Sequence, residues 1–207
     1  MTRLLLVRHG ETEWNREERF RGRADIPLNA KGLAQAEATA RCIASRYEPS
    51  AVYASPLSRA VQTAEAIASR YPLPVQVHAG LADIDYGQWQ GLSPDEVRAR
   101  WPRLLAEWYQ TPQLSRIPGG ESLGDLAARG LQAIREISHA HEDRTVVAVG
   151  HTVINRVILL CMLGLGNDRF WRIRQDTCAI NEIEMAGEEF TLVSLNDTCH
   201  LRSGLGL

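Results

Sequence analysis

The sequence predicts an α/β fold, a three-layer α/β/α sandwich with a mainly parallel central sheet. Short aliphatic or β-branched runs, typical of strands buried on both faces, occur at residues 3–7, 51–54, 75–78 and 145–149. Amphipathic helical patterns separate these runs, and strands that alternate with helices indicate a parallel sheet. A last pattern over residues 180–195, interrupted at Gly187, predicts a closing hairpin at a sheet edge.

The first helical pattern follows Asn29, a residue type that caps helix N-termini. Leu33, Ala36, Ala40 and Ile43 recur after it at helical spacing, which predicts an amphipathic helix with these residues on its apolar face.

Two later helices are predicted to start where a strand ends. Ser55 is the expected N-cap of one, and Pro56 its first helical residue. Gly150 marks the same strand-to-helix switch before the other.

Residues 85–121 have a different composition, rich in Trp, Tyr, Pro and Gly. Two short helical pieces are expected near residues 93–100 and 102–110. We expect a single domain over residues 1–207 in which this segment forms a cap or loop insertion over one end of the sheet.

Composition and charge limit the possible functions. The chain has 207 residues, 44% hydrophobic and 23% charged, which is enough to bury one sizeable core. A net charge of −2 and a pI near 6.3 give no general attraction to nucleic acid or to an anionic membrane. Four cysteines without a C-x-x-C pair, and no apolar run of signal-peptide or membrane-spanning length, predict a cytoplasmic protein. The sequence does not indicate the oligomeric state.

Polar clusters follow each predicted parallel strand. They are the tripeptide at residues 8–10, the segment 55–59, Asp83, and the tripeptide at residues 150–152. Because ligands of open parallel sheets bind beyond the carboxyl ends of the strands, we expect these clusters to meet at one edge.

The side chains in these clusters favour phosphate chemistry. Arginine side chains and helix N-termini both bind multiply charged oxyanions. Neighbouring guanidinium groups would lower the pKa of His9 and keep it neutral, as a nucleophile that attacks phosphorus must be. A carboxylate such as Asp83 could then protonate the departing alkoxide and later accept a proton from water.

Five blocks of the sequence, LLLVRHGETEWN, SPLSRAVQTAEAI, LADIDYGQWQGL, PGGES and AVGHTVINRVI, resemble in order and spacing the histidine phosphatase superfamily. That superfamily includes the cofactor-dependent phosphoglycerate mutases. The resemblance covers nearly the whole chain and implies a three-layer fold and catalysis through a phosphohistidine, with no metal or other cofactor.

The resemblance also implies residue roles. His9 would be the nucleophile, and Arg8, Arg59 and His151 would hold the phosphoryl oxygens. Asn15 would add a hydrogen bond to them.

The acid/base position falls on Asp83, where the family usually has glutamate, and Asp85 is its rival. Gln90 likewise replaces a usual glutamate. Arg21 and Gly22 are further candidates for substrate contact.

The leading functional hypothesis is a phosphomonoesterase of the histidine acid phosphatase type, acting on a small phosphorylated metabolite. The first alternative is a 2,3-bisphosphoglycerate-dependent phosphoglycerate mutase. Such an enzyme needs cations for a second phosphate, and residues 75–97 contain no Lys or Arg. The aromatic cap suggests a small leaving group that is weakly anionic or uncharged.

Two further hypotheses assign the chain to other functional classes. His9, His151 and Asp83 could form a two-histidine, one-carboxylate metal site, although neighbouring arginines would repel a cation. The chain could also be an inactive member that serves as a binding module.

Overall fold

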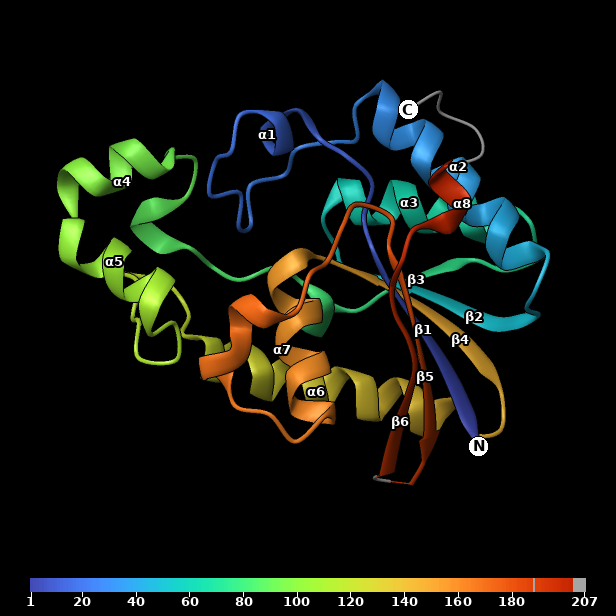
Figure 1. Cartoon of the computed structure of the whole chain (residues 1–207). Coiled ribbons are helices and arrows are strands. Elements are labelled where there is room, and N and C mark those ends of the chain that lie inside the picture. The colour runs from blue at the N-terminus through green and yellow to red at the C-terminus, as the bar shows by residue number, and fades with distance from the viewer. Residues whose placement is uncertain (188, 203–207) are drawn as a thin grey trace.

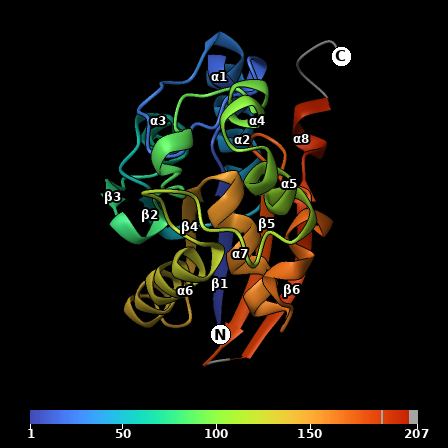
Figure 2. The same cartoon turned by 90° about the vertical axis from the view of Figure 1, so that its left-hand side faces the viewer.

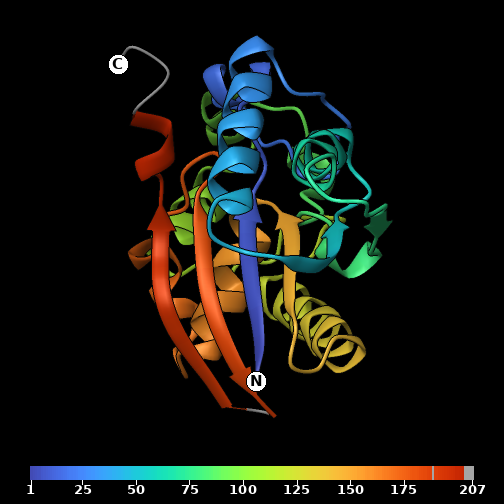
Figure 3. The same cartoon turned by 90° about the vertical axis from the view of Figure 1, so that its right-hand side faces the viewer.

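The computed structural model describes residues 1–187 and 189–202, and its centre is a six-stranded sheet. The strands are β1 (Thr2–Arg8), β2 (Pro49–Ala54), β3 (Val75–Val77), β4 (Thr145–Gly150), β5 (Ile180–Ala186) and β6 (Glu189–Asp197). Their order across the sheet is β3-β2-β4-β1-β5-β6. The first four are parallel, and the β5–β6 hairpin pairs antiparallel with β1 and forms one edge of the sheet (Figure 3). The predicted fold class and hairpin are confirmed.

The register of the parallel strands aligns their carboxyl ends. Arg8 at the end of β1 lies opposite Gly150 at the end of β4, and Ala54 of β2 lies opposite Val149 of β4. Polar residues that directly follow these strands therefore emerge side by side.

Two pairs of long helices cover the sheet. α2 (Ala30–Ala44) and α3 (Ser58–Ala68) lie on one face, and α6 (Leu123–Ala140) and α7 (Thr152–Met162) lie on the other (Figures 1 and 2). The shorter helices are α1 (Glu13–Arg16), α4 (Pro94–Arg100), α5 (Pro102–Gln110) and α8 (Cys199–Arg202), with 3-10 turns at Ala79–Leu81, Gly87–Trp89 and Asn167–Arg172. Among the helices in the described ranges, none is long and apolar enough to cross a membrane.

The apolar run of β1 supplies both layers of the core. Leu4 and Leu6 pack in the cluster under α6 and α7, whereas Leu5 and Val7 pack in the cluster under α2 and α3. All four side chains are fully buried, and each contributes about 1.5–3 kcal/mol by leaving water.

The α2 helix begins as predicted, but the prediction that Leu33 lies on its buried apolar face is wrong. The Asn29 side chain caps the helix by accepting from the Gly32 N–H at 2.8 Å. Leu33 is 50% exposed, while Ala36 and Ile43 are buried. Gly32 packs against the backbone of Glu11. Leu33 follows it and therefore lies on another side of the helix, where it faces solvent.

The predicted start of α3 is also wrong. The helix begins at Ser58 rather than Pro56, and Ser55 does not cap it. The Asp25 carboxylate takes that role, because its two oxygens accept from the Ser58 N–H and hydroxyl, each at 2.7 Å. The Ser55 hydroxyl instead accepts from the Leu57 N–H at 3.3 Å, in the turn before the helix, and also contacts the site.

Residues 85–121 contain α4 and α5 at the predicted places, and Figure 1 shows both helices beyond the carboxyl ends of the strands. Trp89, Val97, Leu105 and Trp108 bury their side chains in the same cluster as α6 and α7. The segment is therefore fixed to the body by its own apolar residues.

Candidate active site

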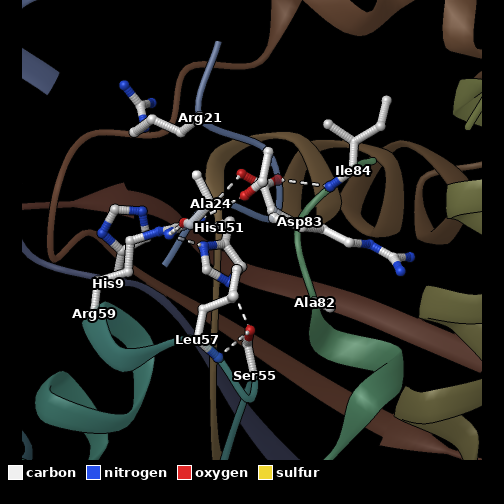
Figure 4. A network of polar contacts seen from close by, with 12 residues as sticks. His9, Arg21, Ala24, Ser55, Leu57, Arg59, Ala82, Asp83, Ile84 and His151 are labelled. Carbon is white, nitrogen blue, oxygen red and sulfur yellow. Dashed lines mark hydrogen bonds and ion pairs between the residues drawn. The ribbon is translucent and has the colours of Figure 1, made fainter. Parts of the chain in front are cut away.

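The structure brings His9, Arg59, Asp83 and His151 together at the carboxyl ends of the parallel strands (Figure 4). The ring centroids of the two histidines lie 5.0 Å apart. The Arg59 Nε donates to His151 Nδ1 at 3.1 Å, and its Nη2 lies 3.8 Å from the Asp83 carboxylate. Four elements that are distant in the sequence thus form one buried polar cluster.

His9 is held in one tautomer by its own loop. Its Nδ1 lies 2.6 Å from the Gly10 carbonyl oxygen, which can only accept, so Nδ1 carries the proton. The Nε2 lone pair is therefore available for attack. Burial, followed by the positive charge of Arg59, lowers the pKa of His9 well below its ordinary value and keeps the ring neutral.

Gly10 is required for close approach of two backbones. A Cβ at this position would lie 2.5 Å from the Gly32 carbonyl oxygen in the first turn of α2. The Gly10 N–H donates to the Thr63 hydroxyl of α3 at 3.1 Å. The loop carrying His9 is thus fixed against both helices on that face of the sheet.

His151 is at the N-cap position of α7, but its side chain does not cap the helix. It turns into the cluster, where Nδ1 accepts from Arg59 and Nε2 lies 2.7 Å from the Ser55 hydroxyl. An acceptor at Nδ1 makes the ring neutral, with the proton on Nε2. Burial and then Arg59 lower the pKa of His151. Ser55 is a site residue that sequence reasoning misread as a cap.

The two arginines are held by backbone carbonyl oxygens. Arg59 donates to Ala24 at 2.7 Å and to Gly22 at 2.8 Å, and Arg8 donates to Gln175 at 2.6 Å. Burial lowers the pKa of Arg8 to about 9 and that of Arg59 to about 10, so both stay charged at neutral pH.

Asp83 is buried beside Arg59 and has its carboxylate inside the cluster. One oxygen accepts from the Ile84 N–H at 3.0 Å. Burial raises the pKa of Asp83 and outweighs the opposing effect of Arg59, which suits a group that donates a proton.

The rival carboxylate, Asp85, faces away into a turn. It accepts from the Gly87 N–H at 2.8 Å, and its own N–H donates to Glu121 at 2.8 Å. The geometry favours Asp83 as the acid.

The loop that carries Asp83 is held by Arg129 of α6, which sequence reasoning missed. Its guanidinium donates to the carbonyl oxygens of Gly80, Ala82 and Asp83 at 3.0, 2.7 and 2.8 Å. Glu121 of the PGGES block holds that guanidinium through bonds of 2.8 and 3.0 Å. The block thus secures the loop that carries Asp83, which its residue types alone do not reveal.

Asn15 stabilises the start of the short helix α1 through a capping box with Thr12. Its side-chain oxygen accepts from the N–H and the hydroxyl of Thr12 at 2.9 and 2.8 Å. A contact to phosphate would therefore come from its amide nitrogen, and this role stays a prediction.

Arg21 lines the cavity next to Asp83. Gly22 is buried with a φ of 49°, and its carbonyl oxygen faces Arg59. The contact seen for Gly22 is thus to an arginine of the site, and its contact to substrate stays a prediction.

A cavity of about 320 Å³ opens next to the cluster. Its polar part consists of Glu18, Arg19, Arg21, Asp83 and Thr152. Its aromatic wall consists of Phe20, Tyr86, Trp108, Tyr109 and Trp171. The cavity thus adjoins the cluster at Asp83.

No group of three or more His, Cys, Asp or Glu side chains is placed to hold a metal ion within residues 1–187 and 189–202. The guanidinium of Arg59 lies between His151 and Asp83, in the space that a shared cation would need. These side chains do not fit a two-histidine, one-carboxylate site.

The chain is similar to known proteins over nearly its whole length. The sequence profile of the histidine phosphatase superfamily (branch 1) matches residues 4–198. The matched span contains every residue of the cluster.

Individual relatives cover nearly all of the chain. Phosphoserine phosphatase 1 of Hydrogenobacter thermophilus is 35% identical over 201 residues, which are 97% of this chain and 95% of the relative. The metal-independent phosphoserine phosphatase of Arabidopsis thaliana is 32% identical over 98% of this chain and 84% of its own length. The solved structure of Bacillus stearothermophilus YhfR superposes with a TM-score of 0.93 at 31% identity, covering 97% of this chain and 100% of that one.

Proposed function

This chain belongs to the histidine phosphatase superfamily, and we propose that it hydrolyses small phosphomonoesters through a phosphohistidine on His9, without a metal ion. The observation that carries the proposal is the pairing of a neutral His9, whose Nε2 is free to attack, with a buried Asp83 of raised pKa. A nucleophile and a proton donor thus meet at one anion-binding edge.

In the first step, the Nε2 lone pair of His9 forms a bond to phosphorus as the bond from phosphorus to the ester oxygen breaks. The departing oxygen takes the proton of the Asp83 carboxylic acid. The products are phosphohistidine, an alcohol and the Asp83 carboxylate.

In the second step, water attacks the phosphohistidine, and the bond from phosphorus to Nε2 breaks. The Asp83 carboxylate accepts the proton that the water loses. Inorganic phosphate leaves, and both groups return to their starting states.

The phosphoryl oxygens would be bound by Arg8, Arg59 and His151, with the Asn15 amide in addition. The proton on His151 Nε2, which now points at Ser55, is a donor of the right kind. Charged guanidinium groups held by backbone carbonyls are already oriented, so little reorganisation is needed as charge develops.

Residues 85–121 would cap the site. Tyr86, Pro94, Trp108 and Tyr109 of this segment line the cavity, so they would surround the leaving group. Two relatives are named phosphoserine phosphatases, and this supports a small phosphorylated metabolite as substrate. The free state of Cys42, Cys161, Cys178 and Cys199 is compatible with the cytoplasmic location that we propose.

The test is a rapid quench, without acid, after mixing the protein with a labelled phosphomonoester. We expect label on histidine that is lost in acid and stable in base, and no labelled protein in His9→Ala. Label on serine or aspartate would overturn the mechanism. Activity that EDTA abolishes and added metal restores would indicate a metal-dependent hydrolase instead.

A parallel assay with 2,3-bisphosphoglycerate and 3-phosphoglycerate checks the mutase alternative. We expect release of phosphate without conversion to 2-phosphoglycerate. Rapid conversion would identify a mutase.

A further inference from the structure

Arg156 of α7 is a cation that the phosphoryl chemistry does not use. Its guanidinium carbon lies 5.1 Å from the Phe170 ring centroid and 5.2 Å from that of Trp171. Its Nε is buried and has no hydrogen-bond partner among residues 1–187 and 189–202. A donor that is buried without an acceptor is costly, so the aromatic contacts alone do not account for this arginine.

The helix places this cation behind the cavity lining, against the ring of Trp171. Arg156 follows Thr152 by four residues, so both lie on the same face of α7. Thr152 and Trp171 line the cavity, and the Thr152 hydroxyl is also buried without a partner. The charge of Arg156 contributes to the lowered pKa of Arg8 at the phosphate end of the site, which places the two cations within electrostatic range.

A second cation approaches the cavity from the segment after α1. Arg21 lines the cavity and donates one hydrogen bond, from Nη1 to the Trp14 carbonyl oxygen at 3.0 Å, while its Nε is buried without an acceptor. Arg19 lines the cavity too, but Glu17, Glu96 and the Gly91 carbonyl already engage it. Arg21 and Arg156 therefore retain donors for a ligand.

We propose that Arg156, assisted by Arg21, binds a carboxylate on the leaving group, so that the preferred substrates are phosphomonoesters of hydroxy acids or amino acids. This inference rests on the proposed hydrolysis and names its substrate class. A guanidinium stacked on rings presents its planar fork to a carboxylate, which accepts two parallel hydrogen bonds.

The assignment differs from the expectation of a weakly anionic or uncharged leaving group. That expectation came from the aromatic composition of the cap and its few cations. The cations come instead from α7 and from the loop after α1, and the fold brings them to the aromatic wall.

The test compares substrates that differ only in the carboxylate. Phosphoserine is paired with phosphoethanolamine, and 3-phosphoglycerate with glycerol 3-phosphate. We expect the wild-type kcat/KM to favour the carboxylated member of each pair by about tenfold or more, as one charge-assisted hydrogen-bond pair provides. Arg156→Met should lower kcat/KM for the carboxylated members by about 10–100-fold and change the others by less than about threefold.

Matched variants separate recognition from folding. Arg169→Met removes an exposed arginine of the neighbouring 3-10 turn and should leave both ratios unchanged. Arg156→Lys retains the positive charge but lacks the planar guanidinium, so it should keep part of the preference for carboxylated substrates. This variant also serves as the test if Arg156→Met does not fold.

Equal losses on both members of each pair, or a wild-type preference for the members without a carboxylate, would overturn the assignment of Arg156. The aryl ester p-nitrophenyl phosphate is included in every assay. If the wild-type protein hydrolyses neither this ester nor any paired substrate, the proposed function itself fails.

Discussion

Arg59 Nε donates a hydrogen bond to His151 Nδ1 at 3.1 Å inside the buried cluster. Arginine has no acceptor and stays protonated, so this bond requires a lone pair on Nδ1 and a proton on Nε2. His9 has the opposite tautomer, because its Nδ1 donates to the Gly10 carbonyl. The site thus holds one ring with a free lone pair on Nε2 and one ring with a proton on Nε2.

The two tautomers can be observed directly. We expect the imidazole ¹⁵N shifts at pH 7 to report Nδ1–H for His9 and Nε2–H for His151. Arg59→Met should raise the pKa of His151 toward its ordinary value, because one of the causes that lower it is removed. The same tautomer on both rings would contradict the hydrogen-bond pattern.

The loss of rate on replacing Asp83 should depend on the leaving group. Asp83→Asn should slow hydrolysis of alkyl phosphates by about 10²–10⁴-fold and that of p-nitrophenyl phosphate much less, because a good leaving group needs no proton. Since a protonated Asp83 is the active form, its ionisation should produce the alkaline limb of the kcat/KM profile for alkyl esters, and Asp83→Asn should remove that limb. Asp85→Asn is the control, and if it had the larger effect on alkyl phosphates, the acid role would move to Asp85.

Arg129 should affect catalysis through Asp83. Arg129→Met frees three carbonyl oxygens of the acid loop, and we expect about a tenfold or greater loss on alkyl phosphates with little loss on p-nitrophenyl phosphate. In an Asp83→Asn background the same change should cost almost nothing further. Additive losses would mean that Arg129 acts independently of the acid, and Tm values for all four proteins would show any loss of folding.

The buried histidines should make the protein sensitive to acid. Their pKa values are lowered on folding, so below about pH 6.5 the unfolded chain binds protons that the folded one does not, and stability falls as the pH falls. Asp83 has the opposite sign, because its raised pKa gives stability at low pH that is lost as the pH rises through the folded value. Urea unfolding at pH 7.5 and 5.5 should show a smaller difference for His151→Gln than for the wild type. The exposed His139→Gln should match the wild type.

The close approach at Gly10 predicts a large effect from a single methyl group. Gly10→Ala should destabilise the fold by about 1–3 kcal/mol and displace His9, because the Cβ would collide with the Gly32 carbonyl oxygen. Gly124→Ala in α6, where the nearest atom to a Cβ is 3.6 Å away, should instead be neutral or stabilising by up to about 1 kcal/mol. Thermal unfolding of both variants checks the contrast, and equal Tm values would be inconsistent with close packing at Gly10.

Much of this molecule was predictable because its signals are local. Aliphatic runs, their alternation with helices and the break at Gly187 determined the sheet and its edge hairpin. The position of His9, Arg59 and His151 just after strands or at helix starts was enough to place them at one edge. Leu33 and Ser55 were misread, since the face that a helix buries and the group that caps it depend on partners far away in the sequence.

The residue pattern along the chain is sufficient for the fold class and for the identity of the groups that meet, because parallel strands align their ends whatever follows them. The states and the surroundings of these groups come from the three-dimensional packing. It fixed the two imidazole tautomers, buried Asp83 rather than Asp85, attached the acid loop to Arg129, and brought Arg156 to the aromatic wall. The His9 tautomer depends on the conformation of its own loop, and the other features depend on burial and on contacts between distant segments. No pattern of residue types along the chain encodes either.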